Sequence, residues 1–122
     1  MIQPHYDEKL NLTTFVCSGQ VTAVEIEEQV KALYRGTPSL HALWDYTDAD
    51  VSALSPADIS GIAKFVKTAS HSRAGGRTAL VFPTEMLSNM APLLESISEI
   101  EVPDAKIKIF ADLDAALAWV SA

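Results

Sequence analysis

The chain has 122 residues, a net charge of −7 and a hydrophobic content of 48%. The length suits one domain with its own core, and the hydrophobic content excludes a disordered chain. The negative charge argues against nucleic acid as a partner and against a basic membrane-docking patch, because both require clustered lysine and arginine.

The single cysteine, Cys17, cannot form an intramolecular disulfide, which fits a reducing compartment. The first residues have no basic start followed by an apolar stretch, so we expect no signal peptide. No apolar run approaches the roughly 20 residues of a membrane span. We therefore expect a cytoplasmic protein without an integral membrane segment.

The first third of the chain predicts a hairpin and a helix. Residues 2–8 and 11–18 are two expected strands, separated by a polar turn and rich in β-branched and aromatic residues. Thr22 and Glu25 have the spacing of a capping box. The apolar positions that follow recur with helical periodicity, and the helix is expected to end at Gly36.

The middle of the chain predicts two buried strands around a helix. Residues 40–44 form a short apolar run that is typical of a central strand, and residues 45–50 are expected to form a polar loop. Ser55-Pro56 marks the start of the next helix, with serine as the cap and proline at the first helical position. Residues 70–76 are expected to form a flexible loop, and residues 78–82 a second buried strand.

The last third predicts two more helices around an edge strand. Residues 86–97 show helical spacing of apolar side chains, and Pro92 is expected to kink or split this helix. Residues 106–110 alternate polar and apolar, as in a half-exposed or edge strand. A final helix is expected to be capped by Asp112 or Asp114.

The predicted order is therefore β-β-α-β-α-β-α-β-α. Strands joined by helices favour a mixed, mostly parallel sheet with helices packed on it, and the opening hairpin adds an antiparallel edge. We find no internal repeat or domain boundary, so residues 1–122 are expected to form a single α/β domain.

Three stretches of the sequence resemble one known family. They are a strand-end glycine before a capped helix at residues 19–25, a strand with an acidic segment at residues 43–50, and a closing segment with an Ala-x-Trp ending at residues 110–120. Together, in this order, they resemble the SpoIIAA-like family. These are STAS-like domains related to anti-sigma-factor antagonists, mostly uncharacterised bacterial proteins. The resemblance implies a STAS-like fold and a non-catalytic domain that binds partners or small ligands.

The resemblance also implies a candidate switch. In the antagonist branch, a serine at the start of the second helix is phosphorylated and releases a partner protein. The nearest hydroxyls here are Ser52 and Ser55, but the aspartate before and the glycine after the acceptor are missing. With Asp45 and Asp48, these serines form the candidate phosphoacceptor or partner-contact loop. Ser55 has a purely structural alternative as a helix N-cap.

A second candidate site is apolar. Trp44, Phe82, Met86 and Met90 are expected to cluster where two strands end beside the third helix. Such a cluster is either ordinary core packing or a groove for a small, lipid-like ligand, since methionine adapts to irregular apolar shapes. The overall resemblance of SpoIIAA-like proteins to Sec14-type lipid-binding domains implies the same ligand class.

Other candidate chemistry is weak. Asp45, Asp48 and Asp50 could hold Mg²⁺ or Ca²⁺, but they match no EF-hand pattern and suit turns and caps better. The basic loop with Arg73 and Arg77 could bind an anion but has no Walker pattern and is expected to be solvated. We expect no metal, no cofactor and no enzymatic activity.

The sequence thus favours a non-catalytic regulatory or protein-interaction domain, whose partner is another protein. The alternative is a carrier or sensor of a small apolar ligand. A homodimer through an exposed strand edge or an apolar helix face stays open.

Overall fold

A five-stranded sheet forms the centre of the computed structural model, which describes residues 1–100 and 105–122. Strand β1 pairs antiparallel with β2, and all other pairs are parallel. The predicted mixed sheet is therefore confirmed, with β3 at its centre and β1 and β5 at its edges. The strands are β1 Ile2–Asp7, β2 Leu12–Gln20, β3 His41–Asp50, β4 Gly76–Val81 and β5 Ala105–Phe110.

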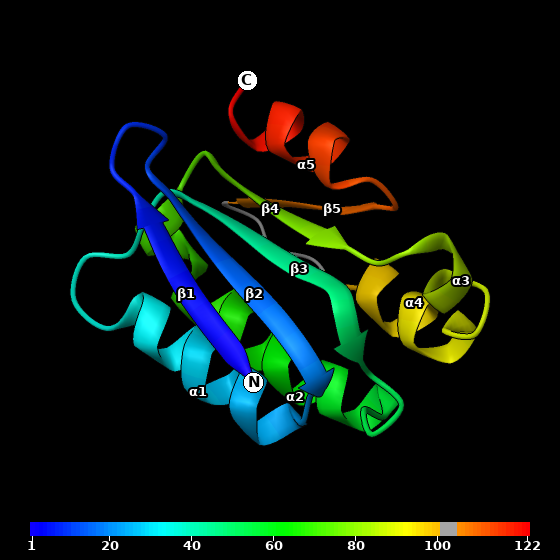
Figure 1. The fold of residues 1–122 in the computed structure, drawn as a ribbon. Helices are drawn as coiled ribbons and strands as arrows, with labels where there is room; N and C mark the ends of the chain where they lie inside the picture. The colour runs from blue at the N-terminus through cyan, green and yellow to red at the C-terminus, as the bar shows by residue number, and fades with distance from the viewer. Residues whose placement is uncertain (101–104) are drawn as a thin grey trace.

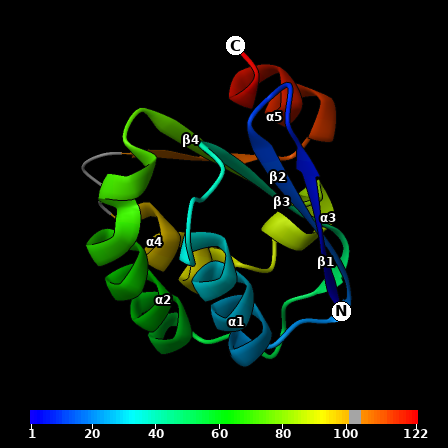
Figure 2. The same ribbon diagram turned by 90° about the vertical axis from the view of Figure 1, so that its left-hand side faces the viewer.

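Helices cover the sheet on both sides (Figures 1 and 2). Helices α1, α2 and α4 lie on one face, and α5 lies on the other, where it contacts β3, β4 and β5. The helices are α1 Ala23–Tyr34, α2 Pro56–Ala69, the 3₁₀ helix η1 Ser70–Arg73, α3 Thr84–Leu87, α4 Ala91–Ser98 and α5 Leu113–Val120.

The central strand sends alternate side chains into two separate cores. Trp44 belongs to the larger cluster under α1, α2 and α4, whereas its neighbour Leu43 belongs to the smaller cluster under α5. Successive side chains of a strand point to opposite faces, so a strand covered on both sides needs a continuous apolar run. This explains the run at residues 40–44.

Capping residues set the helix starts as predicted. Thr22 and Glu25 form a complete capping box at α1. Ser55 forms another at α2 with Asp58, and Pro56 follows at the first helical position. At α5 the cap is Asp112, whose carboxylate accepts the N–H of residue 114 at 3.1 Å.

Pro92 splits the predicted helix at residues 86–97. It lies in the first turn of α4, and the four-residue α3 precedes it. Proline has no N–H to donate but suits the first turn of a helix, where that donor has no intrahelical partner. The chain therefore ends one helix and starts another instead of bending a single one.

The polar loop expected at residues 45–50 is wrong, because β3 continues through Asp50. Strand β2 pairs with this segment as far as Gln20↔Asp50, across a register shift between Val16 and Ser18. Tyr46 is buried in the larger core. Backbone pairing with a long neighbour, together with one buried aromatic, keeps an acidic segment in the sheet.

The flexible loop expected at residues 70–76 is also wrong. Residues 70–73 form η1, and the side chain of Arg73 is only 3% exposed. Gly76 then lies so close to the preceding strand connection that a Cβ there would meet the Leu40 carbonyl oxygen at 2.1 Å. Close backbone approach therefore requires glycine at this position.

Candidate functional site

An apolar cavity of about 110 Å³ lies between the sheet and helices α1, α2 and α4. Trp44, Phe82 and Met90, three of the four residues predicted for an apolar site, line it. The fourth, Met86, does not. Since protein interiors are close-packed with few voids, a partly open cavity against the larger core is a distinct feature of this fold.

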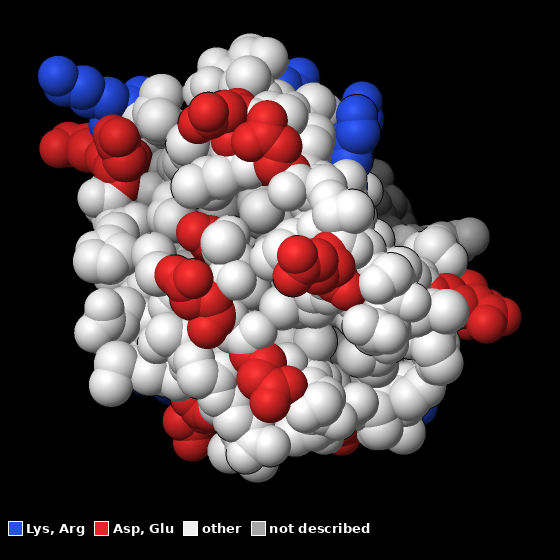
Figure 3. All heavy atoms as spheres, turned by 45° about the vertical axis from the view of Figure 1, so that its right-hand side comes forward, with Lys and Arg blue, Asp and Glu red and all other residues white. Residues whose placement is uncertain are grey.

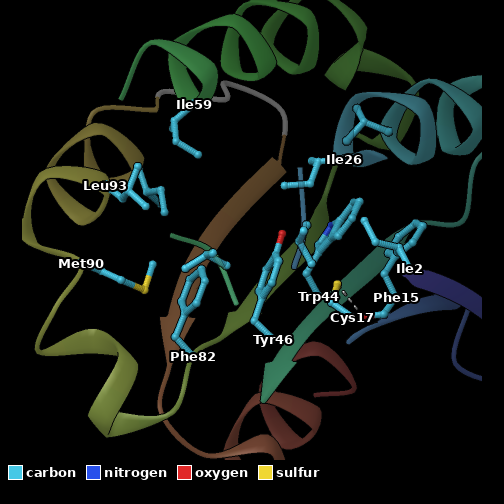
Figure 4. Packing of buried hydrophobic residues seen from close by; sticks show 14 of the residues in the cluster. Ile2, Phe15, Cys17, Ile26, Trp44, Tyr46, Ile59, Phe82, Met90 and Leu93 are labelled. Carbon is cyan, nitrogen blue, oxygen red and sulfur yellow. Dashed lines mark hydrogen bonds between the residues drawn. The ribbon is translucent and has the colours of Figure 1, made fainter. Parts of the chain in front are cut away.

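A row of aromatic rings lies across the sheet (Figure 4), and three of its members, Trp44, Tyr46 and Phe82, line the cavity. Phe15 stacks on Trp44 with ring centroids 3.9 Å apart, and Tyr46 stacks on Phe82 at 4.8 Å. The register pairs Phe15 with Trp44, and Tyr46 follows two residues later on the same face of β3. The sheet geometry therefore holds the rings in nearly parallel planes.

Tyr46 brings a hydroxyl group to the lining of the cavity. Tyr46 is 5% exposed, and its hydroxyl makes no hydrogen bond within residues 1–100 and 105–122. Figure 4 shows its oxygen pointing away from β3 toward the helices. Burial, with a smaller contribution from Cys17, raises the pKa of Tyr46, so the group stays a neutral donor at physiological pH.

A buried guanidinium lies at the other end of the lining. The guanidinium contacts Thr78, which also lines the cavity and lies beside Ala42 on β3. Tyr46 is four residues farther along β3, which corresponds to about 13 Å of strand. Arg73 joins three segments by donating hydrogen bonds to neutral oxygen atoms. Its Nε donates to the carbonyls of Ser39 at 3.2 Å and Leu40 at 3.1 Å, and its Nη1 donates to the Tyr34 hydroxyl at 3.1 Å. Its Nη2 donates to the Arg77 carbonyl at 3.4 Å and to the Thr78 hydroxyl at 3.0 Å.

A surface groove of about 610 Å³ lies outside the cavity, between the β3–α2 connection and α3–α4. Ser52 and Met86 line it, so the two sites that the sequence predicted separately meet here. Leu54, Met90 and Leu93 line both the groove and the cavity. These three side chains, the shared wall, separate the interior from the surface.

The two predicted serines have different surroundings. Ser55 is half-buried in its capping box, where its N–H donates to Asp58 at 2.9 Å and its hydroxyl accepts the N–H of that residue at 3.2 Å. Ser52 is exposed. Hydrogen bonds from the Ser52 hydroxyl and N–H lower the pKa of Asp50, which keeps a negative charge beside this serine.

The structure does not bring Asp45 to the serines. Asp45 pairs in register with Val81, which belongs to the core under α5, so its side chain points to the opposite face of the sheet. There it accepts the N–H of Thr47 at 3.0 Å. Asp48 is exposed on β3 beside Ser18. In the part of the chain that the structure describes, no three acidic, histidine or cysteine side chains are placed to hold a metal.

Cys17 is a buried thiol on the core side of β2. Burial first, and then the negative charge of Asp45, raise its pKa to about 12. A thiol with such a pKa carries almost no thiolate at neutral pH, as is typical of a structural group.

Acidic side chains dominate the face that carries the groove. Figure 3 shows aspartate and glutamate spread across this side of the molecule, whereas lysine and arginine lie at its rim. The one charged residue that lines the groove itself is Asp50. The face is therefore complementary to a basic surface.

The family model for SpoIIAA-like proteins matches residues 12–121. The chain belongs to the SpoIIAA-like family. A crystal structure of an uncharacterized protein from the DUF3478 family, with a SpoIIAA-like fold, from Shewanella loihica PV-4 is similar with a TM-score of 0.59 and 21% identity. The match covers 98% of this chain and 92% of that one, and at this identity it shows the fold alone.

None of the curated proteins compared with the chain matches it. Within residues 1–100 and 105–122, no helix is long and apolar enough to cross a membrane.

Sequence reasoning misjudged the surroundings of two polar residues that line the cavity, because it expected Tyr46 within a polar loop and Arg73 in a solvated one. Tyr46 follows Trp44 at the two-residue spacing of one strand face, and this spacing could have placed it in the core. Arg73 was expected in a solvated loop that could bind an anion, and its burial had no local signal, because it depends on the Ser39 and Leu40 carbonyls and the Tyr34 hydroxyl, which are distant in sequence.

Proposed function

We propose that this domain is a non-catalytic regulatory module that senses a small apolar molecule in the cavity between its sheet and helices. The cavity carries the proposal: it has a volume of about 110 Å³ and largely apolar walls, between the sheet and the helices. An apolar cavity of about 150 Å³ binds benzene or xenon. The volume therefore suits a single ring or a short branched chain, and it is too small for a long acyl chain.

The shared wall supports a regulatory output. A molecule in the cavity touches Leu54, Met90 and Leu93 from inside, and the same side chains shape the groove outside. Methionine is flexible and changes rotamer easily. A ligand that prefers one arrangement of the wall shifts the population of groove shapes by its differential affinity for them.

The test is a titration with benzene followed by amide chemical shifts and by hydrogen exchange. We expect saturable shifts for residues facing the cavity, such as Ile26 and Ile59, and slower exchange near the wall at residues 50–54. Val120, in the core under α5, serves as the internal control and should not shift. Absence of saturable shifts at the cavity would refute ligand sensing.

A second candidate function rests on the groove. We propose that its apolar floor and acidic surroundings bind a basic segment of a partner protein, through the loop with Ser52 and Ser55 and the nearby Asp48. Ser52 is the accessible hydroxyl of the pair, and Ser55 is engaged as a cap. Asp45, on the other face, stands outside this contact surface.

This second candidate is tested by native mass spectrometry of protein purified from its own cells. A phosphate-sized mass increment that maps to Ser52 and disappears in Ser52→Ala supports a phosphorylation switch at the groove. An unmodified chain from cells in several growth states counts against the switch. The same spectra also report any small molecule that copurifies in the cavity.

A further inference from the structure

Within residues 1–100 and 105–122, no carboxylate pairs with the positive charge of Arg73. Its side chain is 97% buried, and every acceptor it reaches is a neutral carbonyl or hydroxyl oxygen. Within the described residues, the salt bridge that forms joins the N-terminal ammonium to Glu25, and neither residue lines the cavity. A buried charge is costly unless it is paired, so a guanidinium with only neutral acceptors among the described residues is suited to an anionic ligand.

The guanidinium also has hydrogen-bonding capacity left. It carries five N–H donors. Nε donates its hydrogen to the two carbonyls of residues 39 and 40, and Nη2 uses both of its hydrogens. Nη1 donates to the Tyr34 hydroxyl alone, which leaves one N–H without an acceptor in the described part of the chain. Arg73 and Tyr34 both line the cavity.

We infer that the cavity binds a small apolar monocarboxylate, with its carboxylate on Arg73 and its hydrocarbon body among the apolar walls. This inference rests on the proposed ligand sensing and names the ligand class. Nη1 and the Tyr34 hydroxyl lie 3.1 Å apart and both residues line the cavity, so a carboxylate oxygen beside them gains a charge-assisted hydrogen bond. The rest of the molecule then extends along β3 toward Tyr46.

The number of donors favours a carboxylate over a phosphate group. A phosphate carries more charge and more oxygens than one arginine and one hydroxyl can satisfy in a buried site. The volume of about 110 Å³ limits the hydrocarbon part to a few carbons. Short branched acids such as isovalerate meet both limits.

The test compares isovalerate with isovaleramide, its neutral counterpart of nearly the same shape, by calorimetry at pH 7. At this pH the acid is ionised, and we expect it to bind at least about tenfold more tightly than the amide. In Arg73→Gln this preference should disappear. Arg77→Gln is the matched control, because the Arg77 guanidinium lies over the Trp119 ring on the α5 side and does not line the cavity.

The outcomes separate the two proposals. Equal affinities for acid and amide in the wild-type protein would overturn the carboxylate inference while leaving ligand sensing intact. Failure of benzene, acid and amide alike to bind would overturn both. Because Arg73→Gln removes several structural hydrogen bonds, its folding is checked by circular dichroism, and Arg73→Lys should retain part of the preference. If neither variant folds, the comparison of the two probes in the wild-type protein decides alone.

Discussion

His41 is the residue at which the two arginines of this region act together. Its Nδ1 accepts the backbone N–H of Arg77 at 3.0 Å, which requires that nitrogen to be unprotonated. Burial first, and then the positive charges of Arg73 and Arg77, lower the pKa of His41. The folded protein therefore holds this imidazole neutral at a pH where the unfolded chain protonates it.

The sign of the resulting pH dependence follows from this lowered pKa. Below the ordinary histidine value of about 6.5 the unfolded chain binds the proton first, so the free energy of unfolding falls as pH drops from 7 toward 5. In His41→Asn, whose side-chain oxygen can accept the same N–H, this part of the pH dependence should disappear. Urea denaturation at several pH values measures it, with His5→Asn on the edge strand β1 as the control. An unchanged pH profile in His41→Asn would contradict the assignment.

Residues such as Arg73 show where sequence reasoning fails. The stretch around it is polar and contains two glycines, which is typical of a solvated loop. Its burial depends on carbonyls of residues 39 and 40 and on the Tyr34 hydroxyl. These partners come from more than thirty positions away, and no local pattern encodes them.

At the scale of elements, the start of α2 separates a structural from a regulatory serine. The Ser55 hydroxyl accepts the N–H of Asp58, and the Ser55 N–H donates to the carboxylate of Asp58. Replacing such a cap by alanine costs about 1 kcal/mol. We therefore expect Ser55→Ala to lower the free energy of unfolding by about that amount, as measured by urea denaturation. The exposed Ser52→Ala is the matched control and should change it little.

A phosphomimetic variant extends this test. Aspartate is a good N-cap, so Ser55→Asp should be nearly as stable as the wild-type protein. If Ser52→Ala destabilises the domain as much as Ser55→Ala, the capping assignment at α2 is wrong.

Helix boundaries that depend on residues within one turn were predictable from the sequence. The length of a strand that depends on pairing with a neighbouring strand was not. The capping pairs at Thr22 and Ser55 and the proline at position 92 act within one helical turn, and the structure confirms them. The extension of β3 through residues 45–50 depends on backbone pairing with β2. Its acidic side chains indicate a loop, and only the partner strand reveals otherwise.

The candidate apolar site was partly predictable for the same reason. Trp44 and Phe82 end apolar runs, and Met90 keeps helical spacing, so each could be placed in a core from the sequence. Whether the space among them is filled depends on how three helices pack against one sheet. Met86 has the same sequence signal but lies on the outer side, in the groove.

At the scale of the whole molecule, the two faces of the sheet are packed differently. The cavity lies on the face that α1, α2 and α4 cover, and the compact core under α5 supports the other face (Figure 2). A void forfeits dispersion contacts and burial, so it lowers stability unless a ligand occupies it. Filling it with protein atoms should therefore raise stability and remove the binding site together.

Val66→Leu tests this consequence, because Val66 in α2 lines the cavity and leucine adds one methylene group. A buried methylene contributes about 0.8 kcal/mol, and leucine is also the better helix former. Val24→Leu in α1, where the side chain is 63% exposed, isolates the helix-propensity part. We expect Val66→Leu to raise the free energy of unfolding by up to about 0.8 kcal/mol more than Val24→Leu, and to weaken benzene binding. A net loss of stability in Val66→Leu would mean that this part of the core is already filled, and would remove the ground for ligand sensing.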